Sequence, residues 1–228
     1  MQNSPRQIFP GVFLIRGRIA TASLAPGFRV YNEDTEKIGG VQYRLWNARK
    51  SKLGAAIVKG LKNLPITPGG SVLYIGAASG TTASHVSDIV GGEGVVFCVE
   101  FAPRAVRDLV KVCERRENML PIPEDARTPE NYADVVAEEA PDGVDAVFQD
   151  VADPEQVRIL KINCERFLKK GGTALLALKA RSISGTGDPQ EIYARVLREV
   201  QTDFEVVQRI DLAPYDIDHM FLALRKKS

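Results

Sequence analysis

The fold is decided by residues 72–82, which read VLYIGAASGTT. The first four form a short apolar run typical of a buried strand, and residues 83–90 follow with helical spacing. The glycines between them let a ligand approach the backbone closely, and the first N–H groups of a helix are free to bind polar or anionic atoms. The spacing departs from the GxGxxG fingerprint of dinucleotide-binding folds. This stretch therefore predicts a strand, a ligand-binding turn and a helix.

Apolar runs and helical patterns alternate through most of the remaining chain. Further strands are predicted at 95–99, 119–122, 144–148 and 174–178, and further helices at 104–115, 130–139, 155–168 and 190–200. Such alternation predicts an α/β fold, in which helices cover both faces of a mostly parallel sheet. The last strand-like runs, 204–212 and 220–224, are separated by a Pro-Tyr pair and predict an antiparallel hairpin at the sheet edge.

The N-terminal part has a different pattern. β-rich runs at 8–15, 19–24 and 41–46 are separated by Pro-Gly and Gly-Gly pairs, which predicts a small antiparallel β unit. Ser51 is placed to cap a following helix. We therefore expect an N-terminal β domain over residues 1–50 and a second domain over residues 51–228.

Composition excludes several classes of protein. No apolar run approaches the ~20 residues of a membrane span, and the first residues lack an apolar signal core, so we expect a soluble, cytoplasmic protein. Cys98, Cys113 and Cys164 lie in apolar patterns without CxxC spacing and are expected to be buried thiols. His85 and His219 are the two histidines, too few for a zinc site of the usual kind, so no metal is expected.

Charge is distributed unevenly along the chain. The net charge is +1, but the segment through Lys62 has eleven basic and three acidic residues, and the remainder has nineteen and twenty-six. Such asymmetry indicates contact with nucleic acid, although a solvated basic face of a small sheet explains it equally well. The surplus of +8 is modest for a self-sufficient RNA binder, which uses roughly 6 to 10 phosphate contacts.

Acidic residues follow successive predicted strands. Glu100 ends the second strand, 24 residues after Gly76, close to the spacing of ~20 at which an acid binds ribose hydroxyls in nucleotide-binding folds. Asp125 follows the third strand and Asp150 ends the fourth. Each acid alone is more often a helix cap, but together they predict a ligand site at the carboxyl edge of the sheet. The chain has no P-loop for triphosphates.

Three basic side chains are candidates for chemistry at the same edge. Lys179 ends an apolar strand, His219 begins the final strand, and Lys52 opens the N-terminal helix. Taken singly, each is more often a surface residue. Lys179 and Asp150 are nevertheless expected to emerge from neighbouring strands at the ligand-binding edge.

These motifs resemble the fibrillarin family of guide-directed RNA 2'-O-methyltransferases, in the compact archaeal form that lacks a Gly-Arg-rich tail. The resemblance extends from about Phe9 to Leu224, and the long run at 72–82 makes it specific. The other matching stretches are Arg44-Leu45-Trp46-Asn47, Ser51-Lys52-Leu53, Val99-Glu100-Phe101, Glu124-Asp125-Ala126-Arg127, Asp150-Val151-Ala152 and Asp218-His219.

The resemblance implies a Rossmann-like fold for S-adenosylmethionine, with a seven-stranded sheet whose last strand is antiparallel. The implied catalytic set is Lys52, Asp150, Lys179 and His219. The implied cofactor set is Gly76, Ala78, Thr81, Thr82, Glu100, Phe101, Asp125, Ala126, Asp150, Val151, Ala152 and Asp153. Two departures stand out: Ala48 replaces a usual proline, and Asp153 replaces a common glutamine and adds a negative charge near the cofactor.

The resemblance further implies methylation of ribose in rRNA and tRNA, directed by box C/D guide RNA in a ribonucleoprotein. The implied partners are a Nop-family scaffold protein and a kink-turn-binding ribosomal-type protein. Lys179 is then the best-placed base for the 2'-hydroxyl proton, although the sequence leaves the base open. The alternatives are a guide-independent methyltransferase acting on a protein side chain or small molecule, a non-catalytic scaffold subunit, and, by fold analogy alone, a dehydrogenase.

Overall fold

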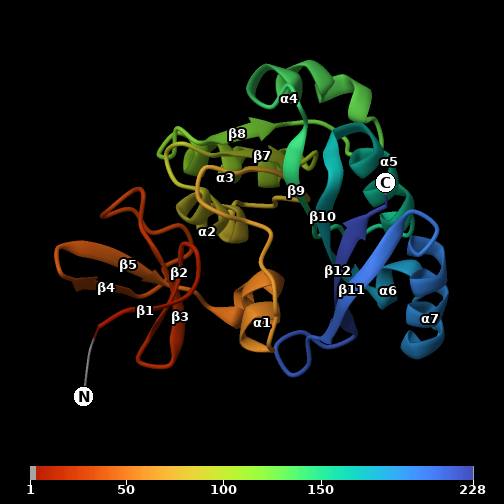
Figure 1. Ribbon diagram of the computed structural model, residues 1–228, viewed down its shortest axis with the longest axis horizontal. Helices are drawn as coiled ribbons and strands as arrows, with labels where there is room; N and C mark the ends of the chain where they lie inside the picture. The colour runs from red at the N-terminus through yellow and green to blue at the C-terminus, as the bar shows by residue number, and fades with distance from the viewer. Residues whose placement is uncertain (1–3, 228) are drawn as a thin grey trace.

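The computed structural model describes residues 4–227, which form two β-sheets and the helices that cover the larger one (Figure 1). Residues 1–3, where the sequence predicts no apolar signal core, lie outside the described range. Within that range no helix combines the length and apolarity needed to cross a membrane. All three cysteines are buried and free, as predicted.

The N-terminal sheet is antiparallel throughout, with strand order β1-β2-β3-β5-β4. Its strands are β1 (Arg6–Phe9), β2 (Val12–Ile15), β3 (Arg18–Ala22), β4 (Thr35–Ile38) and β5 (Val41–Leu45). The predicted run at 8–15 is two strands, because the chain reverses at Pro10 and Gly11, where Gly11 has a φ of +76°. β4 was not predicted, since its two charged residues weaken the apolar signal.

The second sheet has seven strands in the order β11-β12-β10-β9-β6-β7-β8. They are β6 (Ser71–Ile75), β7 (Val95–Val99), β8 (Met119–Ile122), β9 (Val144–Gln149), β10 (Leu168–Lys179), β11 (Phe204–Asp211) and β12 (His219–Lys226). β12 runs antiparallel to both of its neighbours, and the other pairs are parallel. The predicted fold class is confirmed. The hairpin lies at the sheet edge with β11 outermost, and β12 is an inner strand.

Helices cover both faces of this sheet, as the alternating pattern predicted. They are α1 (Lys52–Val58), α2 (Thr81–Val90), α3 (Pro103–Cys113), α4 (Ala133–Glu139), α5 (Gln156–Phe167), α6 (Ala180–Ile183) and α7 (Pro189–Val200), with short 3-10 turns η1 (Ala48–Lys50) and η2 (Pro129–Tyr132). Ser51 caps α1 by accepting a hydrogen bond from the N–H of Gly54. Successive residues of β6 point to opposite faces of the sheet, and each face has its own hydrophobic core. Val72 and Tyr74 pack with α1, α2 and α3, whereas Leu73 and Ile75 pack with α4, α5 and α7.

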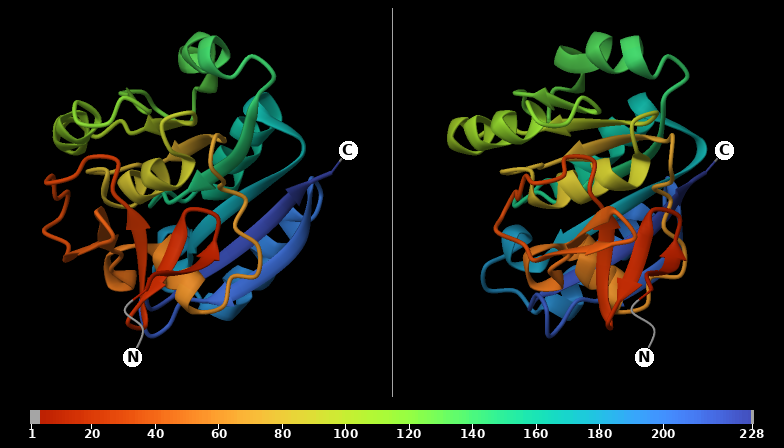
Figure 2. Two further views of the ribbon diagram at one scale, coloured as in Figure 1. Left: turned by 60° about the vertical axis from the view of Figure 1, so that its left-hand side comes forward. Right: turned by 90° about the vertical axis from the view of Figure 1, so that its left-hand side faces the viewer.

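A buried charged cluster joins the N-terminal sheet to α2, and Figure 2 shows this sheet, in red and orange, beside the yellow helix. Arg44 of β5 has a fully buried side chain, 2.6 Å from Glu33 and 2.8 Å from Asp88. Arg116 lies 2.6 Å from the other oxygen of Asp88. Burial alone would raise the pKa of Glu33, but Arg44 and backbone N–H groups lower it below its ordinary value. The two sheets are therefore connected through compensated buried charges.

His85 of α2 extends this cluster as a neutral group. The hydroxyl of Thr21 donates to Asp88 and lies 2.8 Å from Nδ1 of His85, and the hydroxyl of Tyr31 lies 2.8 Å from Nε2. The Thr21 hydroxyl donates its one hydrogen to Asp88, so it can only accept a hydrogen bond from His85. Nδ1 of His85 therefore carries the hydrogen, and Nε2 accepts from the hydroxyl of Tyr31. Burial lowers the pKa of His85 well below its ordinary value of 6.5, and Arg44 and Arg116 lower it further.

Acid should therefore destabilise the fold through His85. The unfolded chain binds a proton at this site below pH 6.5 and the folded chain does not, so stability is lost as the pH falls through that value. The loss should reach about 1.4 kcal/mol by roughly pH 5.5. Urea unfolding at about pH 7.5 and 5.5 measures it: His85→Gln should remove this loss, and His219→Gln should retain it. If His85→Gln and His219→Gln lost the same stability between these two pH values, the loss would not come from His85. Glu33 does not account for it either, because its lowered pKa places its own titration at lower pH.

Candidate functional site

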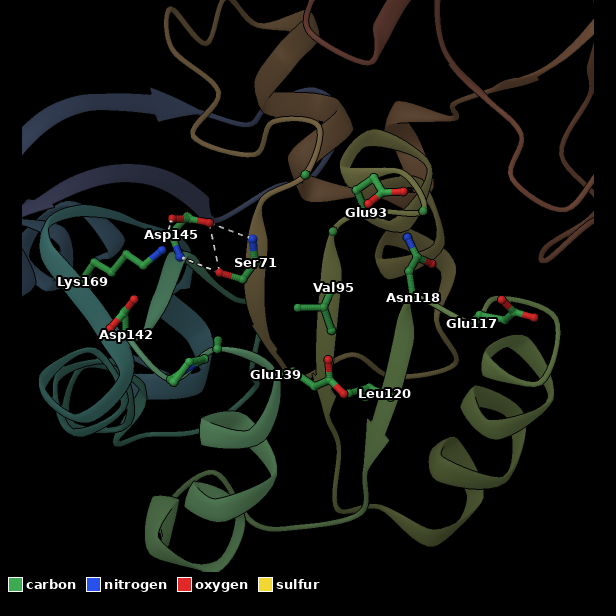
Figure 3. A pocket seen from close by; sticks show the side chains of 16 residues that line it. Ser71, Glu93, Val95, Glu117, Asn118, Leu120, Glu139, Asp142, Asp145 and Lys169 are labelled. Atoms are coloured by element: carbon green, nitrogen blue, oxygen red, sulfur yellow. Dashed lines mark hydrogen bonds and ion pairs between the residues drawn. The ribbon is translucent and has the colours of Figure 1, made fainter.

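Two of the cavities lie at opposite edges of the seven-stranded sheet. One, of about 470 Å³, lies where β6, β7 and β9 begin and has several acidic side chains around it (Figure 3). Figure 3 also shows that Asp145 is engaged by Ser71 and Lys169, with Lys169 Nζ at 2.6 Å. Ligands of open α/β sheets bind at the carboxyl ends of the strands. This first cavity is therefore at the opposite edge from the predicted site.

The second cavity, of about 350 Å³, lies at the carboxyl ends of β6, β7 and β9. Most of the predicted site residues line it: Gly76, Ala78, Glu100, Phe101, Asp125, Ala126, Asp150, Val151, Ala152, Asp153 and Lys179. Val99, Glu124, Arg127 and Ile159 complete the lining. Strand ends that are distant in sequence thus converge on one cavity, as expected for this edge.

Gly76 allows the turn after β6 to pass close to the end of β9. Its φ is +79°, and a Cβ atom there would lie 2.5 Å from the carbonyl oxygen of Asp150. A larger residue would therefore both strain the turn and push Asp150 away. The glycine is required by the packing of the two strand ends.

Glu100 is held in place by the backbone. Its Oε2 accepts a hydrogen bond from the N–H of Ala78, and its Oε1 accepts one from the N–H of Ala102, both at 2.9 Å. A carboxylate has about four acceptor positions, so two remain for a ligand. Glu100 can therefore accept hydrogen bonds from vicinal hydroxyls without rearrangement.

Arg127 lies across the side of the cavity that contains Asp125 and Phe101. Its guanidinium lies 2.7 Å from Asp125 and 3.9 Å from Asp153, and 6.0 Å from the ring of Phe101. Hydrogen bonds from Arg127 lower the pKa of Asp125. The negative charge that Asp153 adds is thus near a compensating cation. Phe101 is 62% exposed, so its ring is accessible to a planar group.

Thr81 and Thr82 do not line the cavity. They begin α2, and the hydroxyl of Thr82 donates to the hydroxyl oxygen of Ser51 at 3.0 Å. Thr82 therefore fixes the start of α2 against the start of α1.

Asp150 lies between two lysines that come from different parts of the chain. Lys52 Nζ is 3.1 Å from Oδ2 of Asp150, and Lys179 Nζ is 3.1 Å from Oδ1. The three side chains are 15–18% exposed. Because Asp150 and Lys179 also line the cavity, the ion-pair cluster adjoins it directly.

His219 lies beside Lys179 because β12 runs antiparallel to β10, which places these two residues opposite each other. Residues opposite each other in neighbouring strands point to the same face. Its Nδ1 lies 2.9 Å from Oδ1 of Asp216, whose Oδ2 lies 3.5 Å from Nζ of Lys52. All four predicted catalytic residues, Lys52, Asp150, Lys179 and His219, thus belong with Asp216 to one set of contacting side chains, the ion-pair cluster, in which His219 carries a charge only when it is protonated.

Asp216 was missed by the sequence reasoning. It lies in the loop between β11 and β12, in neither a strand end nor a glycine-rich turn. Its only signal was its position three residues before His219.

The residues fit S-adenosylmethionine in charge and in hydrogen bonding. Acidic side chains outnumber the two basic ones, Arg127 and Lys179, around the cavity, which suits a cationic sulfonium ligand. The volume lies in the range of small-molecule sites. Among the residues 4–227, no group of His, Cys, Asp and Glu side chains has the arrangement of a metal site.

Comparisons with known proteins agree with this geometry. The family model described as Fibrillarin matches residues 3–228. The chain is 51% identical, over 96% of both chains, to the fibrillarin-like rRNA/tRNA 2'-O-methyltransferase of Thermococcus gammatolerans. It is similar to the structure of Aeropyrum pernix fibrillarin in complex with natively bound S-adenosyl-L-methionine, with a TM-score of 0.89 and 44% identity over 98% of both chains. It is also similar to a chain of a fibrillarin/Nop5p complex, with a TM-score of 0.85 and 37% identity over 97% of this chain and 100% of that one.

Proposed function

This chain belongs to the fibrillarin family, and from that premise we propose that it methylates ribose 2'-hydroxyls of ribosomal and transfer RNA. Its fold is that of the S-adenosylmethionine-dependent methyltransferases. Box C/D guide RNA would select the nucleotides. We propose that the chain has an N-terminal β domain at 1–50 and a methyltransferase domain at 51–228. The separate five-stranded and seven-stranded sheets support this division.

One observation carries the proposal: Asp150 belongs to the cofactor-sized cavity and to the ion-pair cluster at once. A methyl donor in the cavity and a hydroxyl at the cluster would therefore meet at this residue. Proximity of that kind is a large part of the rate enhancement in group transfer.

The cofactor roles follow the positions of the side chains. Glu100 would accept the ribose hydroxyls of the cofactor, supported by its two remaining acceptor positions. Asp125 and Ala126 would bind the adenine. Gly76 and the start of α2 at Thr81 and Thr82 would hold the methionine end. The segment from Asp150 to Asp153 would close the methionine side, where Val151 contributes an apolar surface.

S-adenosylmethionine, when bound, supplies a methyl group already activated by its sulfonium. The task of the protein is then to orient a 2'-hydroxyl in line with that methyl group, and the hydroxyl proton would pass to a base of the cluster, either Lys179 in its amine form or Nε2 of His219. Lys52 and Lys179 would bind the ribose and phosphate oxygens around the reacting hydroxyl, since ammonium groups donate three hydrogen bonds. Asp150 would keep both ammonium groups in position, and His219 lies on the same face of the sheet as Lys179.

The protein would act inside a ribonucleoprotein. The fibrillarin/Nop5p complex supports a Nop-family scaffold partner. We propose a kink-turn-binding ribosomal-type protein and a box C/D guide RNA as further components, because the basic surplus of +8 through Lys62 is modest for independent RNA binding. Archaeal cells have no nucleus and the named relatives are archaeal, so we propose the cytoplasm as the location.

Reconstitution tests the proposal. Labelled S-adenosylmethionine, a target RNA, its guide RNA, the scaffold and the kink-turn protein are combined with this chain. We expect label at one ribose 2'-oxygen, only in the complete mixture. Glu100→Gln should weaken cofactor binding in calorimetry, since bonds to a charged acceptor contribute about 1.5–3 kcal/mol each. Glu93→Gln, at the opposite cavity, is the matched control.

Other outcomes identify the alternatives. Methylation without guide RNA, or of a protein, would indicate a guide-independent methyltransferase. Cofactor binding without transfer in the complete mixture would indicate a scaffold subunit. Binding of NAD in place of S-adenosylmethionine would indicate a dehydrogenase.

A further inference from the structure

Asp216 contacts two members of the ion-pair cluster with one carboxylate. Its Oδ1 lies 2.9 Å from Nδ1 of His219, and its Oδ2 lies 3.5 Å from Nζ of Lys52. The neighbouring acid Asp218 is engaged elsewhere, because it accepts a hydrogen bond from Arg181 at 2.9 Å. Asp216 therefore connects the first residue of α1 to the first residue of β12.

The surroundings of His219 determine where its ring proton lies. Nδ1 faces the carbonyl oxygen of Ile217 at 2.8 Å and the carboxylate of Asp216 at 2.9 Å. Both groups only accept hydrogen bonds, so Nδ1 carries the hydrogen. In the neutral ring, Nε2 then has a free lone pair, and it has no hydrogen-bond partner among the described residues. A carboxylate behind one ring nitrogen is the arrangement that orients the histidine of hydrolase triads.

The loop that contains Asp216 is held against the N-terminal segment by contacts of its backbone. Lys59 donates to the carbonyl oxygen of Ala213 at 2.7 Å, and Arg49 donates to that of Pro214 at 3.4 Å. The N–H of Leu212 donates to the carbonyl oxygen of His219 at 3.1 Å, which closes the base of the loop. The position of the Asp216 carboxylate therefore does not depend on its own ion pairs alone.

Charge gives Asp216 a second effect. Without it, the ammonium groups of Lys52 and Lys179 would share the single carboxylate of Asp150. With it, the cluster has two ammonium groups and two carboxylates. Lys52 is then attracted from both sides and stays between Asp150 and Asp216.

We infer that Asp216 is a positioning residue for methyl transfer, which holds the imidazole of His219 in one orientation and tautomer and holds Lys52 beside Asp150. The inference rests on the proposed function. Asp216 does not line the cofactor cavity, so its effect lies in the transfer step and not in cofactor binding.

The test uses the complete reconstituted particle. Asp216→Asn keeps the size of the side chain and removes its charge, and it should lower kcat at saturating RNA by up to the roughly 10²- to 10⁴-fold that a positioned acid or base contributes. The affinity for S-adenosylmethionine should be unchanged. Asp216→Glu should retain most of the rate because it keeps the carboxylate. Asp211→Asn is the control, since the Asp211 carboxylate accepts from the N–H of Ala213 in the same loop.

Measuring Asp216→Asn a second time, in a protein that already carries His219→Gln, separates a positioning role from a structural one. In a His219→Gln protein, Asp216→Asn should cause a smaller loss than it causes alone, because the part that acts through His219 is already absent and only the part that acts through Lys52 remains. An equal loss in both backgrounds would overturn the inference, as would a wild-type rate for Asp216→Asn. An inactive wild-type particle would instead refute the proposed function.

Discussion

Asp150→Asn should lower the rate of methyl transfer by about 10²- to 10⁴-fold, the range of acid–base and positioning groups. Among residues 4–227, its carboxylate is the one group that pairs with both Lys52 and Lys179, at 3.1 Å each. An amide has no charge to hold two ammonium groups, and both amines would move apart by mutual repulsion. Single-turnover transfer to the guided RNA, with cofactor affinity measured separately by calorimetry, gives the effect on the chemical step.

Lys179→Met and the double variant complete this experiment. If Asp150 acts by holding Lys179, the double variant should be scarcely slower than the slower single variant. Unfolding curves should stay close to those of the wild type, because Asp150 and Lys179 line the cavity and are partly exposed. A rate near that of the wild type for Asp150→Asn would mean that the reacting hydroxyl is oriented by other residues.

Arg44→Met should destabilise the fold by about 3–5 kcal/mol, the usual cost of removing one partner from a buried ion pair. Arg44 has a fully buried side chain and pairs with both Glu33 and Asp88. Asp88 would keep Arg116, but Glu33 would lose the ion pair that Arg44 supplies. Methionine fills a similar space, so the loss reports the uncompensated charge. Equilibrium unfolding in urea measures it.

Arg18→Met provides the matched control. Arg18 pairs with Asp34 at 2.9 Å, but the two side chains are 50% and 65% exposed. Exposed pairs contribute about 0–1 kcal/mol. Glu33→Gln added to Arg44→Met should recover part of the stability, because it removes the unpaired charge. Equal effects of Arg44→Met and Arg18→Met would show that water reaches the buried cluster.

Much of the site edge could be predicted because it depends only on where strands end. Glu100, Asp150 and Lys179 each follow an apolar run whose direction is set by the alternation of strands and helices. The antiparallel last strand followed from the hairpin pattern around Pro214. These inferences needed only local periodicity and the rule that parallel strands end at one edge.

Contacts between remote segments could not be predicted in this way. Arg44 and Asp88 are 44 positions apart and belong to different layers, so no periodicity relates them. Asp216 contacts Lys52 only because the β11–β12 loop packs against η1 and α1. The hydroxyl of Thr82 contacts Ser51 at the start of α1, a contact that a glycine-rich pattern does not reveal. Tertiary packing decides all three.

The inner position of β12 has a consequence for the order in which the protein becomes functional during synthesis. β12 follows every other strand along the chain, yet it lies between β10 and β11. All residues that line the cofactor cavity lie at or before position 179, whereas Asp216 and His219 come after β11. A nascent chain therefore contains every cavity-lining residue, and three members of the ion-pair cluster, before it contains Asp216 and His219. Chains that stop short of residue 219 lack the strand that pairs with β10 from Thr173 to Lys179, together with the buried side chains of Phe221, Leu222 and Leu224. The strand end that carries Lys179 is therefore completed only when the last strand has been synthesised.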